Sequence, residues 1–440
     1  MADDHTRHSV ESDSGAAAVS RRAFVGAAGA GGVIALAGCS SNGGGNNANS
    51  SGSSGSSSSS SQGSSTGTAT KKAVKIGVTL PLSGTFASLG KGFVRGLELA
   101  AQERFNGKID GRPITFIKKD TKFKPDTAVT VTRNLIQKDD VDFVMGPVSS
   151  ACAEAMKPIV AKAKSTVWVD INAASKSLIA KNCTPYMVRC CVNTYQLGHP
   201  MGKWVYDNLG KKITLGVMDY SFGHSMANMF KPAYEAAGGT VVKTVPSSPS
   251  ASDYGPIVRN IANTDADVFW GVYVGSAATN FLKAAKNFGL LNKMKMTGYG
   301  LVEKVVLAAV GDADVGFPST EYYSWQIQNQ TNQNYLQTFK KKYGGLPSVN
   351  SVFAYDGMTL VNDAVTKAGS TRPDKVIPAM RGATIDSPRG NVSINPKTQD
   401  VIAPVFINKA TGPKTSDIEL VHTFSPVKSP NWGCDLSGTL

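Results

Sequence analysis

Residues 74–84 read VKIGVTLPLSG, a run rich in β-branched side chains that ends in proline, serine and glycine. Beyond it, apolar residues between Val94 and Phe105 recur at intervals of three and four, which places them on one face of a helix. We therefore predict a strand over residues 73–80, a loop that ends near residue 90, and then a helix. A buried strand followed by an amphipathic helix is the repeating unit of a parallel sheet.

The same alternation continues along the chain and predicts further strands over 114–118, 141–145, 166–171, 213–218, 240–245, 267–272 and 293–298. Amphipathic stretches separate these runs, a pattern typical of parallel sheets covered by helices. The strands form two series, so we predict an α/β fold of two doubly wound lobes. The pattern becomes less regular after residue 316, as expected when the chain crosses more than once between two lobes. We assign residues 73–193 and about 322–390 to the first lobe, and residues 194–321 and about 391–440 to the second.

The N-terminal residues 1–38 are predicted to be an export signal. Arg21 and Arg22 lie in the segment SRRAFV, which resembles a twin-arginine motif, and a short apolar run follows. The segment LAGC then resembles a lipobox, whose cysteine, here Cys39, carries a lipid after cleavage. The alternative is a transmembrane anchor, but a run of about 11 to 15 residues is shorter than the roughly 20 that span a bilayer. We expect an exported protein held on the outer face of a membrane by its N-terminal lipid.

Residues 39–72 begin with Cys39 and then consist mostly of serine, glycine, asparagine and threonine. Such a composition cannot bury apolar surface and forms a flexible coil. A coil of about thirty residues reaches roughly 30 Å, so we expect a tether that holds the folded body just off the membrane.

The formal net charge is +14, which could attract nucleic acid, an anionic ligand or a membrane surface. The lysines are scattered in short groups, such as residues 340–342, without a neighbouring pattern of aromatic residues. This distribution favours a solvated surface, and we expect no nucleic-acid partner.

Five of the six cysteines remain once Cys39 is assigned to the lipid. Outside the cytoplasm, Cys183 could pair with Cys152, Cys190 or Cys434, and the spacing does not choose between them. The sequence has neither a CxxC motif nor histidines at the spacing of metal ligands. We therefore expect no redox centre, no metal site and no cofactor.

The opening VKIGVTLPLSG resembles the start of the branched-chain amino acid binding protein family, the type I periplasmic binding proteins that serve ABC importers. The segments VMGPVSS (144–150), DYSFG (219–223), SDY (252–254) and GVY (271–273) are similar to that family in order and spacing. The resemblance covers residues 73–425. It implies two lobes that close around a small polar ligand, and a membrane permease that receives this ligand. We expect a monomer.

The resemblance also implies which residues contact the ligand. The matching positions of the first lobe are Ser150, Asn172, Ala173, Ala174 and Ser175, with Phe86 and Ser88 on a loop that borders the same cleft. In the second lobe, Phe222 matches a closing aromatic residue and Tyr273 matches another contact. Loop amides and helix N-termini at the carboxyl ends of parallel strands suit carboxylates, which agrees with this placement. The structural alternatives are that Ser150 caps a helix and that Tyr273 belongs to the core.

One position departs from the family. Members that bind amino acids place an acidic residue where this chain has Gly300, and that acid pairs with the ligand's ammonium group. A buried ammonium without a counter-charge costs several kcal/mol, so the departure puts a zwitterionic ligand in doubt. Glu303, Glu321 or Asp219 could supply the missing charge; otherwise the ligand is an amide, a urea-like compound or an organic acid.

Two other functions fit the sequence less well than a solute-binding protein. An enzyme is disfavoured because the sequence has no GxSxG elbow and no phosphate-binding GxxxxGK[ST] loop. A ligand-binding sensor that signals to a membrane partner is the stronger alternative, because the same two-lobed fold serves receptors. We predict a solute-binding protein that captures its ligand by lobe closure, without covalent chemistry.

Overall fold

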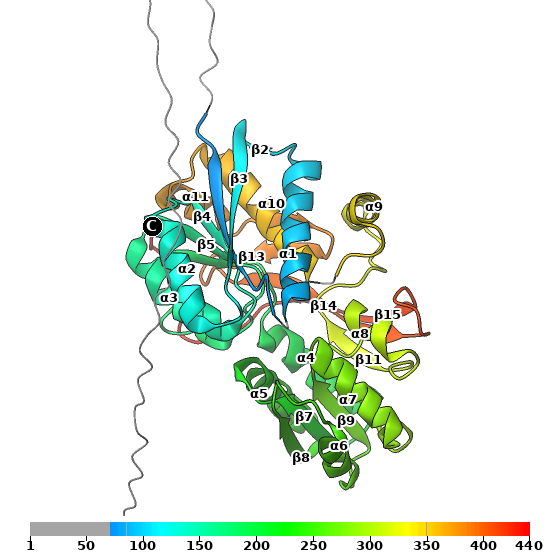
Figure 1. The fold of residues 1–440 in the computed structure, drawn as a ribbon. Helices are drawn as coiled ribbons and strands as arrows, with labels where there is room; N and C mark the ends of the chain where they lie inside the picture. The colour runs from blue at the N-terminus through cyan, green and yellow to red at the C-terminus, as the bar shows by residue number, and fades with distance from the viewer. Residues whose placement is uncertain (1–70, 85, 349) are drawn as a thin grey trace, which may run out of the picture. The chain divides into compact units, whose positions relative to one another are not determined.

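The computed structural model describes residues 71–84, 86–348 and 350–440. These residues belong to one compact unit. The expected export signal, the lipid site Cys39 and the tether up to residue 70 lie outside the described residues. In the described part of the chain, no helix has both the length and the hydropathy of a membrane span. Figure 1 shows that this part folds into two α/β lobes, as the sequence predicts.

The first lobe is built on a six-stranded sheet in the order β2-β3-β1-β4-β5-β6. Its strands are β1 (Val74–Leu80), β2 (Lys108–Ile109), β3 (Arg112–Asp120), β4 (Phe143–Met145), β5 (Val167–Asp170) and β6 (Met187–Arg189). All pairs in this sheet are parallel except β2 with β3. Every residue of β4 and β5 is buried, as expected when helices cover both faces of a parallel sheet.

The helices of the first lobe come from two distant parts of the chain. They are α1 (Ala87–Leu99) with its π-helical continuation η1 (Ala100–Arg104), α2 (Pro125–Gln137), α3 (Ser150–Ala163), the 3-10 turn η2 (Lys176–Ile179), α9 (Gln330–Tyr343), α10 (Ser351–Ala368) and α11 (Pro373–Met380). Helix α10 packs along α1, where Gly96 lies so close to Ser351 that a β-carbon would meet its carbonyl oxygen at 2.1 Å. The chain therefore returns to the first lobe after completing most of the second.

The second lobe contains a mixed sheet in the order β12-β13-β14-β11-β10-β9-β7-β8, and β15 pairs with β14 beside this path. Its strands are β7 (Lys212–Met218), β8 (Thr240–Ser247), β9 (Val268–Val272), β10 (Lys295–Tyr299), β11 (Pro318–Glu321), β12 (Thr384–Ser387), β13 (Gly390–Ile394), β14 (Val401–Ala410) and β15 (Ile418–Val427). Its helices are α4 (Thr194–Asn208), α5 (Ser221–Ala236), α6 (Gly255–Ala262), α7 (Ser276–Asn287), the 3-10 turn η3 (Leu290–Asn292) and α8 (Lys304–Val310). The strands from β8 to β11 are parallel, whereas β14 and β15 are antiparallel to their neighbours.

Three segments connect the lobes and form the hinge: residues 190–193, 322–329 and 395–400. The third follows β12 and β13, which extend the second-lobe sheet but lie at the first lobe, where β12 packs against α10. Buried polar groups join the first and third crossings. The Arg189 guanidinium donates to Asp400 Oδ1 at 2.7 Å, and the Asn193 side-chain amide donates to Asp400 Oδ2 at 2.9 Å. Asn193 also caps α4 by accepting from the backbone N–H groups of Tyr195 and Gln196. The hinge is therefore held by hydrogen bonds and an ion pair as well as by chain connectivity.

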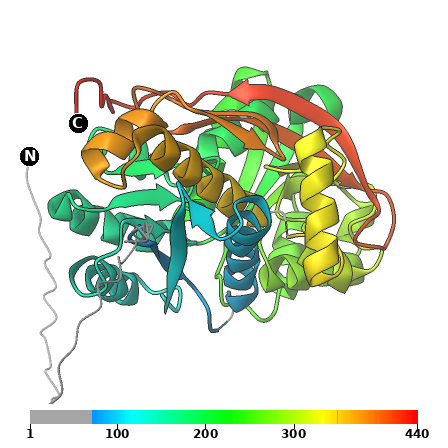
Figure 2. The ribbon, with the colours of Figure 1, turned by 90° about the horizontal axis from the view of Figure 1, so that it is seen from above.

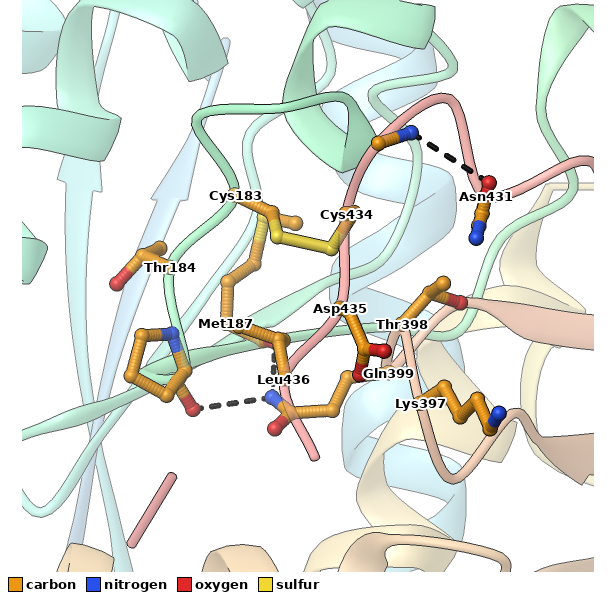
Figure 3. Close-up of a disulfide and its surroundings, with 12 residues drawn as sticks. Cys183, Thr184, Met187, Lys397, Thr398, Gln399, Asn431, Cys434, Asp435 and Leu436 are labelled. Atoms are coloured by element: carbon orange, nitrogen blue, oxygen red, sulfur yellow. Dashed lines mark hydrogen bonds between the residues drawn. A yellow bond between two sulfur atoms is a disulfide. The ribbon is translucent and has the colours of Figure 1, made fainter. Parts of the chain in front are cut away.

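The C-terminal residues do not stay with the second lobe, to which residues 391–440 were assigned from the sequence. After β15 the chain passes to the first lobe, where Cys434 forms a disulfide with Cys183 in the loop before β6 (Figure 3). Of the three partners that the sequence left open for Cys183, the structure selects Cys434. Figure 2 shows the chain end beside the orange helices of the first lobe. Cys152, Cys190 and Cys191 are buried thiols.

Candidate functional site

A cavity lies between the lobes at the carboxyl ends of their parallel strands. It encloses about 670 Å³ of space that is free of protein atoms, part of it open to solvent. Its walls are formed by Phe86, Leu89, Phe123, Val148, Ser149, Ser150, Asn172, Ala174, Val192, Leu197, Tyr220, Phe222, Val274, Tyr299, Glu303, Tyr322, Asn350 and Phe353. Both lobes contribute to it, which is the arrangement expected at the strand ends of open α/β sheets.

The first-lobe end of the cavity is the N-terminus of α3. Ser149 is the N-cap residue, and its Oγ accepts a hydrogen bond from the Cys152 backbone N–H at 3.4 Å. Ser150 follows as the first helical residue and is 6% exposed. The first N–H groups of a helix have no partner within the helix and carry the positive end of its dipole, so they favour a bound anion. Asn172 lies beside them, fixed by a hydrogen bond from its side-chain amide to the Val148 carbonyl at 2.9 Å.

Aromatic side chains form most of the apolar walls. Phe86 and Phe123 stack with ring centroids 3.9 Å apart on the first-lobe side. On the opposite side, Phe222 lies 5.3 Å from Tyr299 by ring centroids. Tyr322, which follows β11, stacks on Phe353 of α10 with ring centroids 4.2 Å apart. A flat or branched apolar group fits between such walls because it removes apolar surface from water.

The second-lobe end of the cavity carries one carboxyl group, that of Glu303. This residue precedes α8, is 6% exposed, and makes no side-chain hydrogen bond to any residue that the structure describes. No lysine or arginine is among the described residues that line the cavity. Burial raises the pKa of Glu303 to about 7. Burial, and secondly the charge of Glu303, raise the pKa of Glu321 well above its usual range.

Residues 73–414 match the family model described as periplasmic binding protein. The chain belongs to the periplasmic binding protein family. Family and fold are those of solute-binding proteins, which are not enzymes and act outside the cytoplasm. The expected role, the substrate-binding component of an ABC transporter, is confirmed at this level.

Individual relatives of this periplasmic binding protein fall into two groups by the ligand in their names. The Leu/Ile/Val-binding protein homolog 6 of Brucella melitensis is 29% identical over 343 residues, which cover 76% of this chain and 87% of the relative. A solute-binding protein from Rhodopseudomonas palustris BisB5, solved with 3,4-dihydroxybenzoic acid, is 27% identical with a TM-score of 0.77, covering 81% of this chain and 99% of that one. A second R. palustris protein, solved with 4-hydroxybenzoate, is 28% identical with a TM-score of 0.76. The match covers 82% of this chain and 99% of that one.

Five of the residues that the sequence proposed for the binding protein's cleft line the cavity. These are Phe86, Ser150, Asn172, Ala174 and Phe222. They come from four separate loops or helix starts, and the fold brings them together because each lies just beyond the carboxyl end of a parallel strand.

Three other proposed residues of the first lobe lie outside the cavity wall. Ala173 is fully buried, and its backbone N–H donates to Asp170 Oδ1 at 2.8 Å. The Ser175 hydroxyl donates to Glu154 Oε1 at 2.7 Å and caps the turn η2. Ser88 is exposed on the first turn of α1. Hydrogen bonds hold Ala173 and Ser175 within the segment after β5, whereas Ser88 is exposed on a helix.

Tyr273 and Gly300 of the second lobe also lie outside the cavity wall. Tyr273 is fully buried in the lobe core and stacks on Phe281 with ring centroids 4.3 Å apart. Its neighbour Val274 lines the cavity instead. Gly300 adopts a φ of +79°, and a β-carbon there would lie 2.1 Å from the Tyr273 carbonyl oxygen. This close approach explains why the position holds glycine and no acid.

Of the three acids named as substitutes, Glu303 is the one that reaches the cavity. Asp219 is an exposed residue paired with His224 at 2.7 Å, and Glu321 accepts from the Ser319 hydroxyl at 3.1 Å within the sheet. Sequence analysis did not propose Tyr220, Tyr299, Tyr322, Asn350 and Phe353, which also line the cavity. In the sequence, the signal for such residues is a polar or aromatic side chain just after a strand. Only the tertiary structure shows which of these side chains face the cavity.

Proposed function

We propose that this binding protein captures a small carboxylate whose body is aromatic or branched and which also carries a hydrogen-bond donor. The observation that carries the proposal is the polarity of the cavity: a helix N-terminus at one end, a single carboxyl group at the other, and aromatic walls between them. The carboxylate of the ligand would accept hydrogen bonds from the Ser150 hydroxyl and the first N–H groups of α3.

The donor group of the ligand would face Glu303. A carboxylate without a partner in a buried cavity favours an ammonium or hydroxyl group, because either restores the hydrogen bonds that water gave it. Ligands named for three of the relatives fit this description: leucine, isoleucine and valine have an ammonium group, and 4-hydroxybenzoate and 3,4-dihydroxybenzoate have hydroxyl groups. Benzoate, named for another solved R. palustris protein, has no such group. The negative charge that is absent at Gly300 would thus come from Glu303, three residues further along the chain.

The proposal includes delivery from a membrane-attached position. The N-terminal motifs around Arg21, Arg22 and Cys39 support export and lipidation, and the serine-rich tether supports a body held just off the membrane. A single lipidated chain would capture the ligand as a monomer, close its lobes, and dock on an ABC permease. Binding involves no covalent step: the ligand favours the closed state by contacts with both lobes.

A thermal-shift panel with protein refolded to remove carried ligand tests the proposed class. We expect 4-hydroxybenzoate or a branched-chain amino acid to raise the melting temperature saturably, because the ligand binds only the native state. Benzoate, which has no donor group, and isoamylamine, which has no carboxylate, are matched controls and should act more weakly. Equal shifts by the controls, or no shift by any carboxylate, would contradict the proposal.

A further inference from the structure

The last thirteen residues, 428–440, form a segment that we call the C-terminal strap. It begins at the end of β15, a strand of the second-lobe sheet that pairs with β14 from Ala403 to Ala410. It ends on the first lobe, where Figure 1 marks the chain terminus on the side of α3 and α11. The strap is therefore a fourth connection between the lobes, in addition to the three hinge crossings.

The near end of the strap is fixed to the hinge. The Gln196 side-chain amide donates to the Val427 carbonyl at 2.6 Å, and the Asn193 side-chain amide donates to the Ser429 hydroxyl at 2.5 Å. Asn193 is the same residue that binds Asp400 on the third crossing. These contacts join the start of the strap to two of the crossings.

The far end of the strap is fixed to the first lobe. Cys434 is fully buried and bonded to Cys183, as Figure 3 shows. Beyond the disulfide, Arg381 at the end of α11 donates to the Thr439 hydroxyl at 2.7 Å and to its backbone carbonyl. Between the two ends, the Trp432 ring lies under Lys176 Nζ at 5.3 Å from its centroid.

We propose that the disulfide-closed strap limits how far the second lobe can open away from the first. A segment that is fixed at both ends can extend only to its contour length, and the disulfide shortens the free part of the strap to the residues before Cys434. The seven peptide units from Val427 to Cys434 span at most about 25 Å when fully extended. Removing the disulfide or lengthening the strap would then allow wider opening, whichever ligand the cavity takes.

The distance between the lobes of the ligand-free protein tests this proposal. Nitroxide labels at Lys91→Cys on α1 and Lys283→Cys on α7, both exposed positions, report it by double electron–electron resonance. Two strap variants are compared with the otherwise unchanged full-length chain: Cys183→Ser with Cys434→Ser, and a short glycine-serine insertion between Pro430 and Asn431 that keeps the disulfide. A matched control carries the same insertion between Pro413 and Lys414, in the exposed turn between β14 and β15.

We expect both strap variants to shift the distance distribution to longer values and to broaden it, while the control insertion leaves it unchanged. The insertion variant is decisive because it retains the disulfide and hence the local stability of the first lobe. If the insertion variant shows the same distribution as the parent chain, the strap does not limit opening and the proposal is wrong. A shift confined to the double serine variant would also contradict it, because the disulfide would then act only within the first lobe.

Discussion

At the residue scale, Glu303 shows how burial determines a chemical role. Its carboxyl group lies among Tyr220, Tyr299 and Tyr322 in the cavity wall, without a basic neighbour among the described lining residues. The cost of charging it in this environment raises its pKa to about 7. A ligand donor group that approaches Glu303 would favour the charged form, so binding and ionisation are coupled at this position.

The raised pKa predicts that the stability of the ligand-free protein depends on pH. The folded state favours neutral Glu303. Its favourable contribution to the free energy of unfolding is therefore fully present below pH 4.5, the ordinary pKa of the group, and is lost as the pH rises toward 7. Glu303→Gln imitates the neutral form. We expect the change in the free energy of unfolding that it causes to be more favourable at pH 8 than at pH 4, by roughly 2–3 kcal/mol. Urea unfolding at both values measures this difference, with Glu235→Gln on the exposed side of α5 as control; a pH-independent effect would contradict the role of burial.

Phe222 and Tyr273 give a second prediction at this scale, because the sequence proposed both as ligand contacts. Phe222→Ala removes part of the cavity wall and should weaken ligand binding by about 1–2 kcal/mol, roughly tenfold. Tyr273→Phe should leave the affinity unchanged, because its hydroxyl group lies within the core of the second lobe. Isothermal titration with the ligand from the thermal-shift panel compares the two variants. Loss of affinity in Tyr273→Phe would show that the cavity extends to that residue.

At the element scale, the ends of the parallel strands determine which residues reach the cavity. The strand and helix of the opening segment and the alternation through β10 follow from hydrophobic periodicity and were predicted. The strand β6 and the helix α8 were not predicted, because three residues and seven residues are too short to show a period. The strands β12 and β11 have four residues each and depend on pairing with distant strands.

The site was predicted less completely than the fold, for a reason that Tyr273 illustrates. Successive residues of an extended chain face opposite sides, so an error of one position exchanges a core residue for a cavity residue. Tyr273 and Val274 differ in this way. Likewise Ala174 lines the cavity whereas Ser175, the next residue, is held by Glu154. Sequence similarity identifies the loop, but hydrogen bonds within the loop decide which side chain faces the ligand.

The turn after β10 carries a prediction about backbone conformation. Both Gly300, with φ +79°, and Gly311, with φ +68°, occupy the left-handed region, but only Gly300 has a backbone atom where a β-carbon would lie. Gly311→Ala should therefore cost only the conformational strain, about 1 kcal/mol, whereas Gly300→Ala should cost roughly 2–3 kcal/mol more. Chemical denaturation of the two variants measures the difference. Equal losses would show that the turn relaxes around the added methyl group.

At the scale of the whole molecule, a buried ion pair at the hinge holds the two lobes in one fold. Arg189, at the end of β6, and Asp400, on the third crossing, are 0% and 3% exposed at their side chains. We expect Asp400→Asn to lower the free energy of unfolding by about 3–5 kcal/mol, because it leaves a buried guanidinium without its counter-charge. The exposed pair Lys203 and Asp207 supplies the control, and Asp207→Asn should cost less than about 1 kcal/mol. Thermal and urea unfolding together would show whether the hinge tolerates the change.

The central claim is that the cavity between the lobes binds a carboxylate at the N-terminus of α3 and its donor group at Glu303. A crystal structure of the protein with 4-hydroxybenzoate or the best amino acid from the panel tests this directly. We expect the ligand carboxylate within hydrogen-bonding distance of the Ser150 hydroxyl, the ring or side chain between Phe86 and Phe222, and the donor group on the Glu303 carboxylate. A ligand bound outside this cavity, or one whose carboxylate lies against Glu303, would contradict it.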